Sequence, residues 1–183
     1  GIAIAVVWFI GITYLNYSEI ISSDIYYGLM AGVFIAIISF IDDIYTLSYL
    51  PRIIVQALST SIALYFVGGL GIVDFGFFTI DSPFLLNVIA FIGILWFINL
   101  FNFIDGINGY SSAGAICISG ALYFFTGDVL ALILLLAVLG FLPWNWGKAK
   151  IFMGDIGSTL LGFTIAVLII HYNKTFQLSI FNG

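Results

Sequence analysis

Charged side chains are scarce in this 183-residue sequence. Only 7% of the residues are Asp, Glu, Lys or Arg and 63% are hydrophobic, whereas roughly 25% of an ordinary soluble domain is charged. So few charges could not cover the surface of a soluble globule of this size, and most of the exterior must face hydrocarbon. The composition excludes a water-soluble domain and predicts an integral membrane protein.

Cysteine, basic residues and histidine are also rare. The single cysteine, Cys117, lies in an apolar run, which excludes an internal disulfide framework and a thiolate metal cluster. The formal net charge of -5 argues against nucleic acid as a partner. The sequence starts with Gly rather than Met and shows no signal peptide, so we expect one membrane domain over residues 1–183 that is incomplete at both ends.

The apolar runs are continuous rather than alternating, which favours helices over a transmembrane barrel. The sequence predicts an all-α, polytopic transmembrane helical bundle with about seven helices, at residues 2–17, 25–41, 53–71, 84–101, 111–126, 129–143 and 156–171. Several runs are shorter than the ~20 residues needed to cross the hydrocarbon core. Their ends are therefore expected to extend into the neighbouring polar stretches.

The distribution of basic residues predicts the orientation. Alternating spans place the connections 42–52, 102–110 and 144–155 on one face, and this face holds three of the four basic residues, Arg52, Lys148 and Lys150. An excess of Lys and Arg marks the cytoplasmic side. We therefore expect a multi-pass protein of the plasma (inner) membrane with these connections in the cytoplasm.

Three polar clusters lie on that face, and the first is the pair Asp42-Asp43 at a helix end. Adjacent carboxylates at a membrane boundary repel each other unless a cation or hydrogen-bond donors lie beside them. Successive helical residues point ~100° apart, so the two carboxylates are expected to divide their work. The alternative interpretation is a pair of solvated carboxylates that cap a helix.

The second cluster contains Asn99, Asn102, Asp105 and Asn108. The first three recur every three residues and share one broad helix face, and the glycines after Asp105 and Asn108 permit a tight turn close to a ligand. Asn and Asp also favour helix ends and turns, which is the structural alternative. Against it stands the cost of placing amides without partners among apolar residues at membrane depth.

The third cluster precedes the last span and includes Lys150, Phe152 and Asp155, with a glycine on either side of the aspartate. A helix start of this kind offers backbone N–H groups to phosphate oxygens, while the carboxylate can hold a metal. The alternative is a capping Asp with a basic flank. Oxygen ligands without histidine or thiolate suit Mg²⁺ or Mn²⁺ better than zinc, and together with the basic residues they indicate phosphoryl transfer to a lipid acceptor.

The three motifs, in this order and on alternate connections, resemble those of the polyprenyl-phosphate N-acetylhexosamine-1-phosphate transferases, and the resemblance spans most of the chain. The family includes enzymes that initiate lipopolysaccharide, teichoic acid and cell-wall synthesis, among them the phospho-MurNAc-pentapeptide transferase. The resemblance implies a Mg²⁺-dependent attack by a polyprenyl phosphate, specifically undecaprenyl phosphate, on the β-phosphate of a UDP-N-acetylhexosamine. The products are a polyprenyl-diphospho-sugar and UMP.

The resemblance also implies roles for individual residues. Asn102 and Asp155 would hold Mg²⁺, and Phe152 would stack on uracil while Asn108 hydrogen-bonds it. Either Asp42 or Asp43 would deprotonate or position the acceptor. Four further assignments complete the set, with Asp105 in the catalytic group and Arg52, Asn99 and Lys150 in the substrate-binding group.

The sequence departs from the family at three points: Asn108 stands where many bacterial members have Asp, Tyr110 stands where they have Leu, and a His-rich cytoplasmic loop is missing. The main alternative is a cation- or proton-coupled transporter, which would need acids near helix centres rather than at helix ends. A structural scaffold would make Asp105→Asn and Asp155→Asn silent. The identity of the sugar is not readable, and a monomer and a homodimer both remain open.

Overall fold

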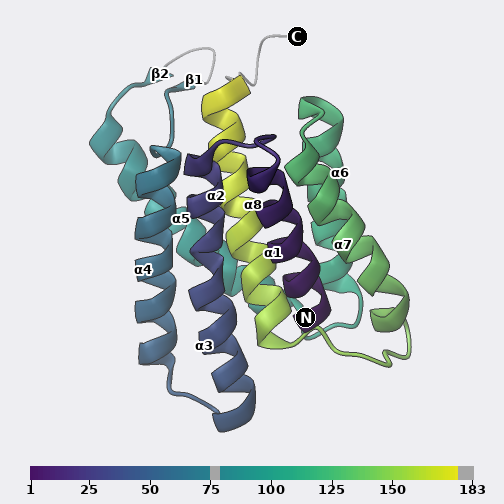
Figure 1. Ribbon diagram of the computed structural model, residues 1–183. Helices are drawn as coiled ribbons and strands as arrows, with labels where there is room; N and C mark the ends of the chain where they lie inside the picture. The colour runs from purple at the N-terminus through teal and green to yellow at the C-terminus, as the bar shows by residue number, and fades with distance from the viewer. Residues whose placement is uncertain (75–78, 177–183) are drawn as a thin grey trace.

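A computed structural model of the protein describes residues 1–74 and 79–176. These residues form helices and one pair of two-residue strands (Figure 1): α1 (Ile2–Tyr17), α2 (Ser23–Met30), α3 (Gly32–Tyr45), α4 (Tyr49–Val67), β1 (Val73–Asp74), β2 (Thr79–Ile80), α5 (Pro83–Ile104), α6 (Tyr110–Thr126), α7 (Val129–Asn145) and α8 (Gly154–Phe176). The strands pair antiparallel, with Val73 opposite Ile80.

The all-α membrane bundle is confirmed. Four helical stretches are long and apolar enough to cross a membrane, namely Ser23–Tyr45, Tyr49–Val67, Pro83–Ile104 and Gly154–Thr175, and α1 and α7 are shorter apolar helices. With α2 and α3 counted as one span, the helices of the described chain correspond to the seven predicted spans.

Several predicted boundaries need correction. The runs at 84–101, 129–143 and 156–171 do extend into the flanking polar stretches, because α5, α7 and α8 end at Ile104, Asn145 and Phe176. The run at 53–71 extends too far, since α4 already ends at Val67, where Gly68 adopts a left-handed conformation with φ of 81°. The run at 25–41 is two helices that meet at Ala31.

Helix α8 is the centre of the bundle (Figure 1), and 78% of its most apolar window is buried inside the protein. It packs against α3 and α5. The close approach to α5 requires a glycine, because a Cβ at Gly162 would lie 2.8 Å from the Ile98 Cα. Large apolar side chains on the outer helices, such as Phe84 and Trp96 of α5, are exposed and can face lipid.

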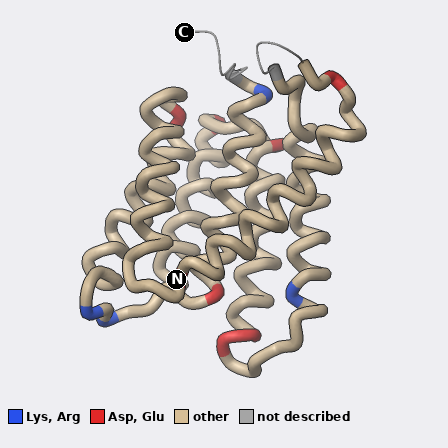
Figure 2. The backbone as a smooth tube through the Cα atoms, turned by 180° about the vertical axis from the view of Figure 1, so that it is seen from behind, with Lys and Arg blue, Asp and Glu red and all other residues tan. Residues whose placement is uncertain are grey.

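The connections α3–α4, α5–α6 and α7–α8 lie together at one end of the bundle, which we call the site face. Figure 2 shows basic residues (blue) toward both ends of the bundle. Arg52 lies in the first turn of α4 and Lys148 and Lys150 in the α7–α8 connection, whereas Lys174 lies in the last turn of α8. The expected grouping of the three motif-bearing connections on one face is therefore present. Its cytoplasmic orientation remains a prediction.

Candidate active site

Arg52 links residues from the three predicted clusters. Its side chain projects from the start of α4, with Nη1 2.8 Å from Asp42 Oδ2 and Nη2 2.9 Å from Asp155 Oδ2. Nη2 also lies 3.5 Å from the amide oxygen of Asn102. Asp42 belongs to α3, Asn102 to α5 and Asp155 to α8, so four helices contribute to one contact network.

Asn102 and Asp155 also contact each other directly. The Asn102 amide donates to Asp155 Oδ1 at 2.8 Å and to the Ser158 hydroxyl at 3.1 Å. Ser158 in turn donates to the Gly154 carbonyl one turn earlier in α8, at 3.0 Å. The two residues expected to hold a metal are therefore adjacent, and Ser158 helps to orient the amide.

Asn99 lies one turn deeper in the bundle and contacts a residue that the sequence did not single out. Its amide donates to Gln56 Oε1 at 3.0 Å and to the Leu95 carbonyl at 2.7 Å. Gln56 is only 3% exposed and follows Arg52 by one helical turn on the same face of α4. A polar residue four positions after Arg52 in an apolar run was the available signal.

The neighbouring carboxylates Asp42 and Asp43 point to different partners. Asp42 is 9% exposed and, besides Arg52, accepts a hydrogen bond of 2.6 Å from the Leu47 backbone N–H. Asp43 is exposed and lies beside Gly154, where a Cβ would be 3.2 Å from Asp43 Oδ2. The two carboxylates therefore have different surroundings, while their division of work and the action of either one on the acceptor remain predictions.

Asp105 lies just past the end of α5 and accepts a hydrogen bond of 2.6 Å from the Ser111 hydroxyl. Burial raises the pKa of the Asp105 carboxyl above its usual value, and the nearby Asp155 carboxylate raises it further. Hydrogen bonds from Ser111 and from the Gly154 backbone N–H oppose the shift. Asp105 therefore lies close to the start of α8. The Gly154 backbone N–H, one of the groups expected to be open to phosphate oxygens, contacts the Asp105 carboxylate.

The residues expected to contact the nucleotide lie on neighbouring connections. Asn108, after α5, donates to the Gly147 carbonyl in the α7–α8 connection at 3.1 Å. Phe152 belongs to the same α7–α8 connection and is 70% exposed, so its ring is free to stack. The Lys150 ammonium instead lies 5.7 Å from the centre of the Trp144 ring, and among the described residues it forms no ion pair.

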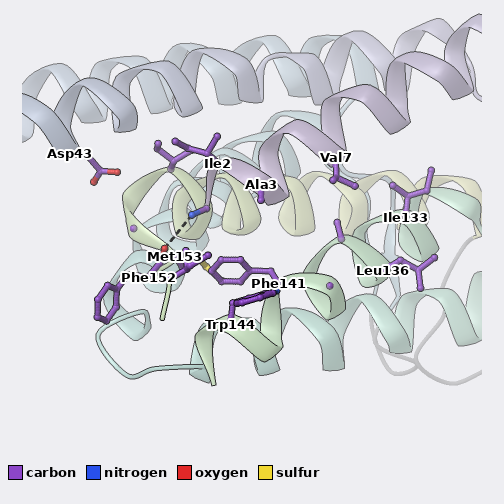
Figure 3. Close-up of a pocket in the computed structure, with 16 residues that line it drawn as sticks. Ile2, Ala3, Val7, Asp43, Ile133, Leu136, Phe141, Trp144, Phe152 and Met153 are labelled. Carbon is purple, nitrogen blue, oxygen red and sulfur yellow. Dashed lines mark hydrogen bonds between the residues drawn. The ribbon is translucent and has the colours of Figure 1, made fainter. Parts of the chain in front are cut away.

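An apolar groove of about 960 Å³ lies beside the Asp43 carboxylate. Figure 3 shows Asp43 toward one end of the groove and Ile133 and Leu136 of α7 toward the other, with Phe141 and Met153 between them. The remaining lining residues come mainly from α1 and α7 and are almost all apolar. A carboxylate and a hydrocarbon-lined surface therefore lie side by side.

The donor set at Arg52 fits a magnesium ion. Among the described residues, no group of three or more His, Cys, Asp or Glu is arranged so that it could hold a metal ion by itself. The described residues do bring the Asp42 and Asp155 carboxylates and the Asn102 amide to one guanidinium, which shows that these groups can surround a cation. Mg²⁺ is usually bound by one or two carboxylates while it keeps several waters or substrate phosphates.

The fold and the site define a multi-helix membrane protein with carboxylates, amides and an arginine gathered at one end. The sequence profile described as "Glycosyl transferase family 4" matches residues 25–173. The chain belongs to this family.

Curated relatives agree with this assignment. The chain is 33% identical to a decaprenyl-phosphate N-acetylglucosaminephosphotransferase of Mycobacterium leprae over 165 residues, covering 75% of this chain and 39% of that protein. It is 32% identical to a probable undecaprenyl-phosphate N-acetylglucosaminyl 1-phosphate transferase of Bacillus subtilis, covering 76% and 42%. A phospho-N-acetylmuramoyl-pentapeptide-transferase of Staphylococcus epidermidis is 34% identical, covering 56% and 35%. The matched region therefore spans about two-fifths or less of these relatives.

Proposed function

We propose that the protein transfers an N-acetylhexosamine-1-phosphate from a UDP-sugar to a polyprenyl phosphate, undecaprenyl phosphate in particular, at the cytoplasmic face of the membrane. The products are UMP and a polyprenyl-diphospho-sugar that starts a cell-envelope polysaccharide. The observation that carries this proposal is the network in which Arg52 joins Asp42, Asn102 and Asp155. The names of the relatives support the two substrate classes.

The proposed reaction joins two anions. An acceptor phosphate oxygen bonds to the β-phosphorus of the UDP-sugar, and the bond from that phosphorus to the oxygen bridging the α- and β-phosphates breaks, so that UMP leaves with the electron pair. Such a transfer depends on charge neutralisation and in-line placement rather than on covalent help from the protein. Arg52 is placed to neutralise a diphosphate, and Mg²⁺ held by Asn102 and Asp155 would add positive charge there.

The acceptor needs orientation more than deprotonation. A phosphate monoester has a second pKa of ~6, so most of it is already a dianion at neutral pH. Asp43 borders the apolar groove, which supports a role in placing the headgroup of a lipid whose chain lies along α1 and α7. The part of α7 that lines the groove, from Ile133 to Trp144, is about 16 Å long at 1.5 Å per residue.

The transporter alternative has less support. The four acids of the motifs lie at helix ends rather than near helix centres: Asp42 and Asp43 in the last turn of α3, Asp105 just after α5 and Asp155 in the first turn of α8. A transporter would show proton or cation flux in liposomes without any UDP-sugar.

The test uses membranes that contain the full-length protein and radiolabelled UDP-N-acetylhexosamine. We expect UMP release only when undecaprenyl phosphate and Mg²⁺ are both present, and we expect Asp155→Ala to abolish it. Asn87→Ala, at the opposite end of α5, is the matched control and should retain activity. Release that survives both EDTA and Asp155→Ala would overturn the proposal.

A further inference from the structure

Asn145 is a buried asparagine that belongs to none of the three motifs. It is the last residue of α7 and is 2% exposed. A side-chain amide at such a depth is costly unless its polar atoms find partners. Its partners identify what it does.

The Asn145 side chain hydrogen-bonds two separate connections. Its Oδ1 accepts from the Gly109 backbone N–H at 2.9 Å and from the Ser112 hydroxyl at 3.3 Å, both after α5. Its Nδ2 donates to the Ile151 carbonyl at 3.1 Å, in the α7–α8 connection. One side chain therefore joins the turn after Asn108 to the segment before Phe152.

Other contacts support the same junction but do not replace it. The Gly109 backbone has φ of 77°, and a Cβ there would lie 2.8 Å from the Trp146 ring, so the two connections touch. The Trp144 carbonyl accepts from the Lys150 and Ile151 N–H groups at 2.9 and 3.1 Å, which folds the second connection back onto α7. Of these contacts, only those of Asn145 run from one buried side chain to both connections.

We propose that Asn145 is a positioning residue for nucleotide recognition, because it fixes the spacing between Asn108 and Phe152. This inference rests on the proposed function and on the expectation, implied by the family resemblance, that Phe152 stacks on uracil and Asn108 hydrogen-bonds it. Asn145 itself acts through them. A polar bond to the edge of a base and a ring stacked on its face both require a fixed separation, which two loosely joined connections would not maintain.

The direct test is the affinity of the full-length, detergent-solubilised protein for UMP, measured by calorimetry. We expect Asn145→Ala to raise the Kd about tenfold, since its three side-chain hydrogen bonds are lost. Ser112→Ala removes a single weak bond and should raise it about twofold. Asn87→Ala again serves as the asparagine control and should bind UMP as the unaltered protein does.

Kinetics separate positioning from general damage. Asn145→Ala should raise KM for the UDP-sugar about tenfold and leave KM for undecaprenyl phosphate unchanged. In the Asn108→Ala background, Asn145→Ala should have a smaller effect on UMP binding, because the effects of substitutions at residues that act as a unit do not add. Amide hydrogen exchange in peptides 105–112 and 146–153 should become faster.

Asn145→Asp provides a second variant if the alanine variant does not fold. It retains the Oδ1 acceptor for Gly109 and loses the donor to Ile151, so exchange should accelerate only in residues 146–153 while UMP affinity still falls. Wild-type UMP affinity in a folded Asn145 variant would overturn this inference. A loss of kcat with both KM values unchanged would also overturn it. Failure of the unaltered protein to bind UMP would instead overturn the proposed function.

Discussion

Removing Arg52 should leave two carboxylates without their shared partner. In Arg52→Ala, the 9%-exposed Asp42 retains only the Leu47 N–H, and Asp155 retains Asn102. Breaking a buried ion pair typically costs about 3–5 kcal/mol, because a charge stays buried without compensation. The Arg52 and Asp155 side chains are 22% and 28% exposed, so solvent screens part of this network. We therefore expect a loss near the lower figure, about 3 kcal/mol.

The assay is thermal unfolding of the detergent-solubilised protein with and without Mg²⁺. If Asp42, Asn102 and Asp155 form a cation site, Mg²⁺ should raise the melting temperature of Arg52→Ala more than that of the unaltered protein. Arg52→Lys should be intermediate, because one ammonium cannot reproduce the two-pronged contact. Asp42→Asn in the Arg52→Ala background should restore part of the stability by removing the uncompensated charge. An Arg52→Ala protein with unchanged stability and unchanged UMP release would refute the reasoning.

Three further outcomes are expected. Gln56→Leu should cost about 1–2 kcal/mol and lower kcat, since it leaves the Asn99 amide without its buried acceptor; thermal unfolding and UMP release measure both, and neutral behaviour would contradict the contact. The pKa of Asp105 is raised in the folded protein, so its contribution to stability is fully present below its unfolded pKa, ~3.9, and is lost as the pH rises through the folded pKa. Asp105→Asn should remove this part of the pH dependence of unfolding. An unfolding profile identical to that of the unaltered protein at every pH would contradict this prediction. Gly162→Ala should destabilise the bundle by about 1–3 kcal/mol, because its Cβ would lie 2.8 Å from the Ile98 backbone, and an unchanged melting temperature would contradict that packing.

Much of the fold was accessible from the sequence because lipid imposes long apolar runs. The seven spans follow from those runs, and alternation placed the three motif-bearing connections at one end. The details that failed depend on local backbone conformation. Gly68 stops α4 at a left-handed residue, and the break at Ala31, just before Gly32, divides one apolar run into two helices without a proline to mark it.

The site was predicted as a set of residues but not as a network. Motif order identified Asp42, Asn102 and Asp155, yet the position of Arg52 between the carboxylates requires the packing of four helices. Gln56 and Asn145 had no motif to mark them, because their significance lies in partners far along the chain. The sequence marks Lys150 as a basic residue suited to a diphosphate but does not show that its ammonium lies over the Trp144 ring, and its contact with substrate remains a prediction.

The convergence of Asn102 and Asp155 on one divalent cation can be measured with Mn²⁺ as a paramagnetic substitute for Mg²⁺, titrated into the full-length protein with UMP and followed by electron paramagnetic resonance. We predict one bound Mn²⁺ per chain, displaced by Mg²⁺ and lost in both Asp155→Ala and Asn102→Leu. Undiminished Mn²⁺ binding in both variants would contradict the account.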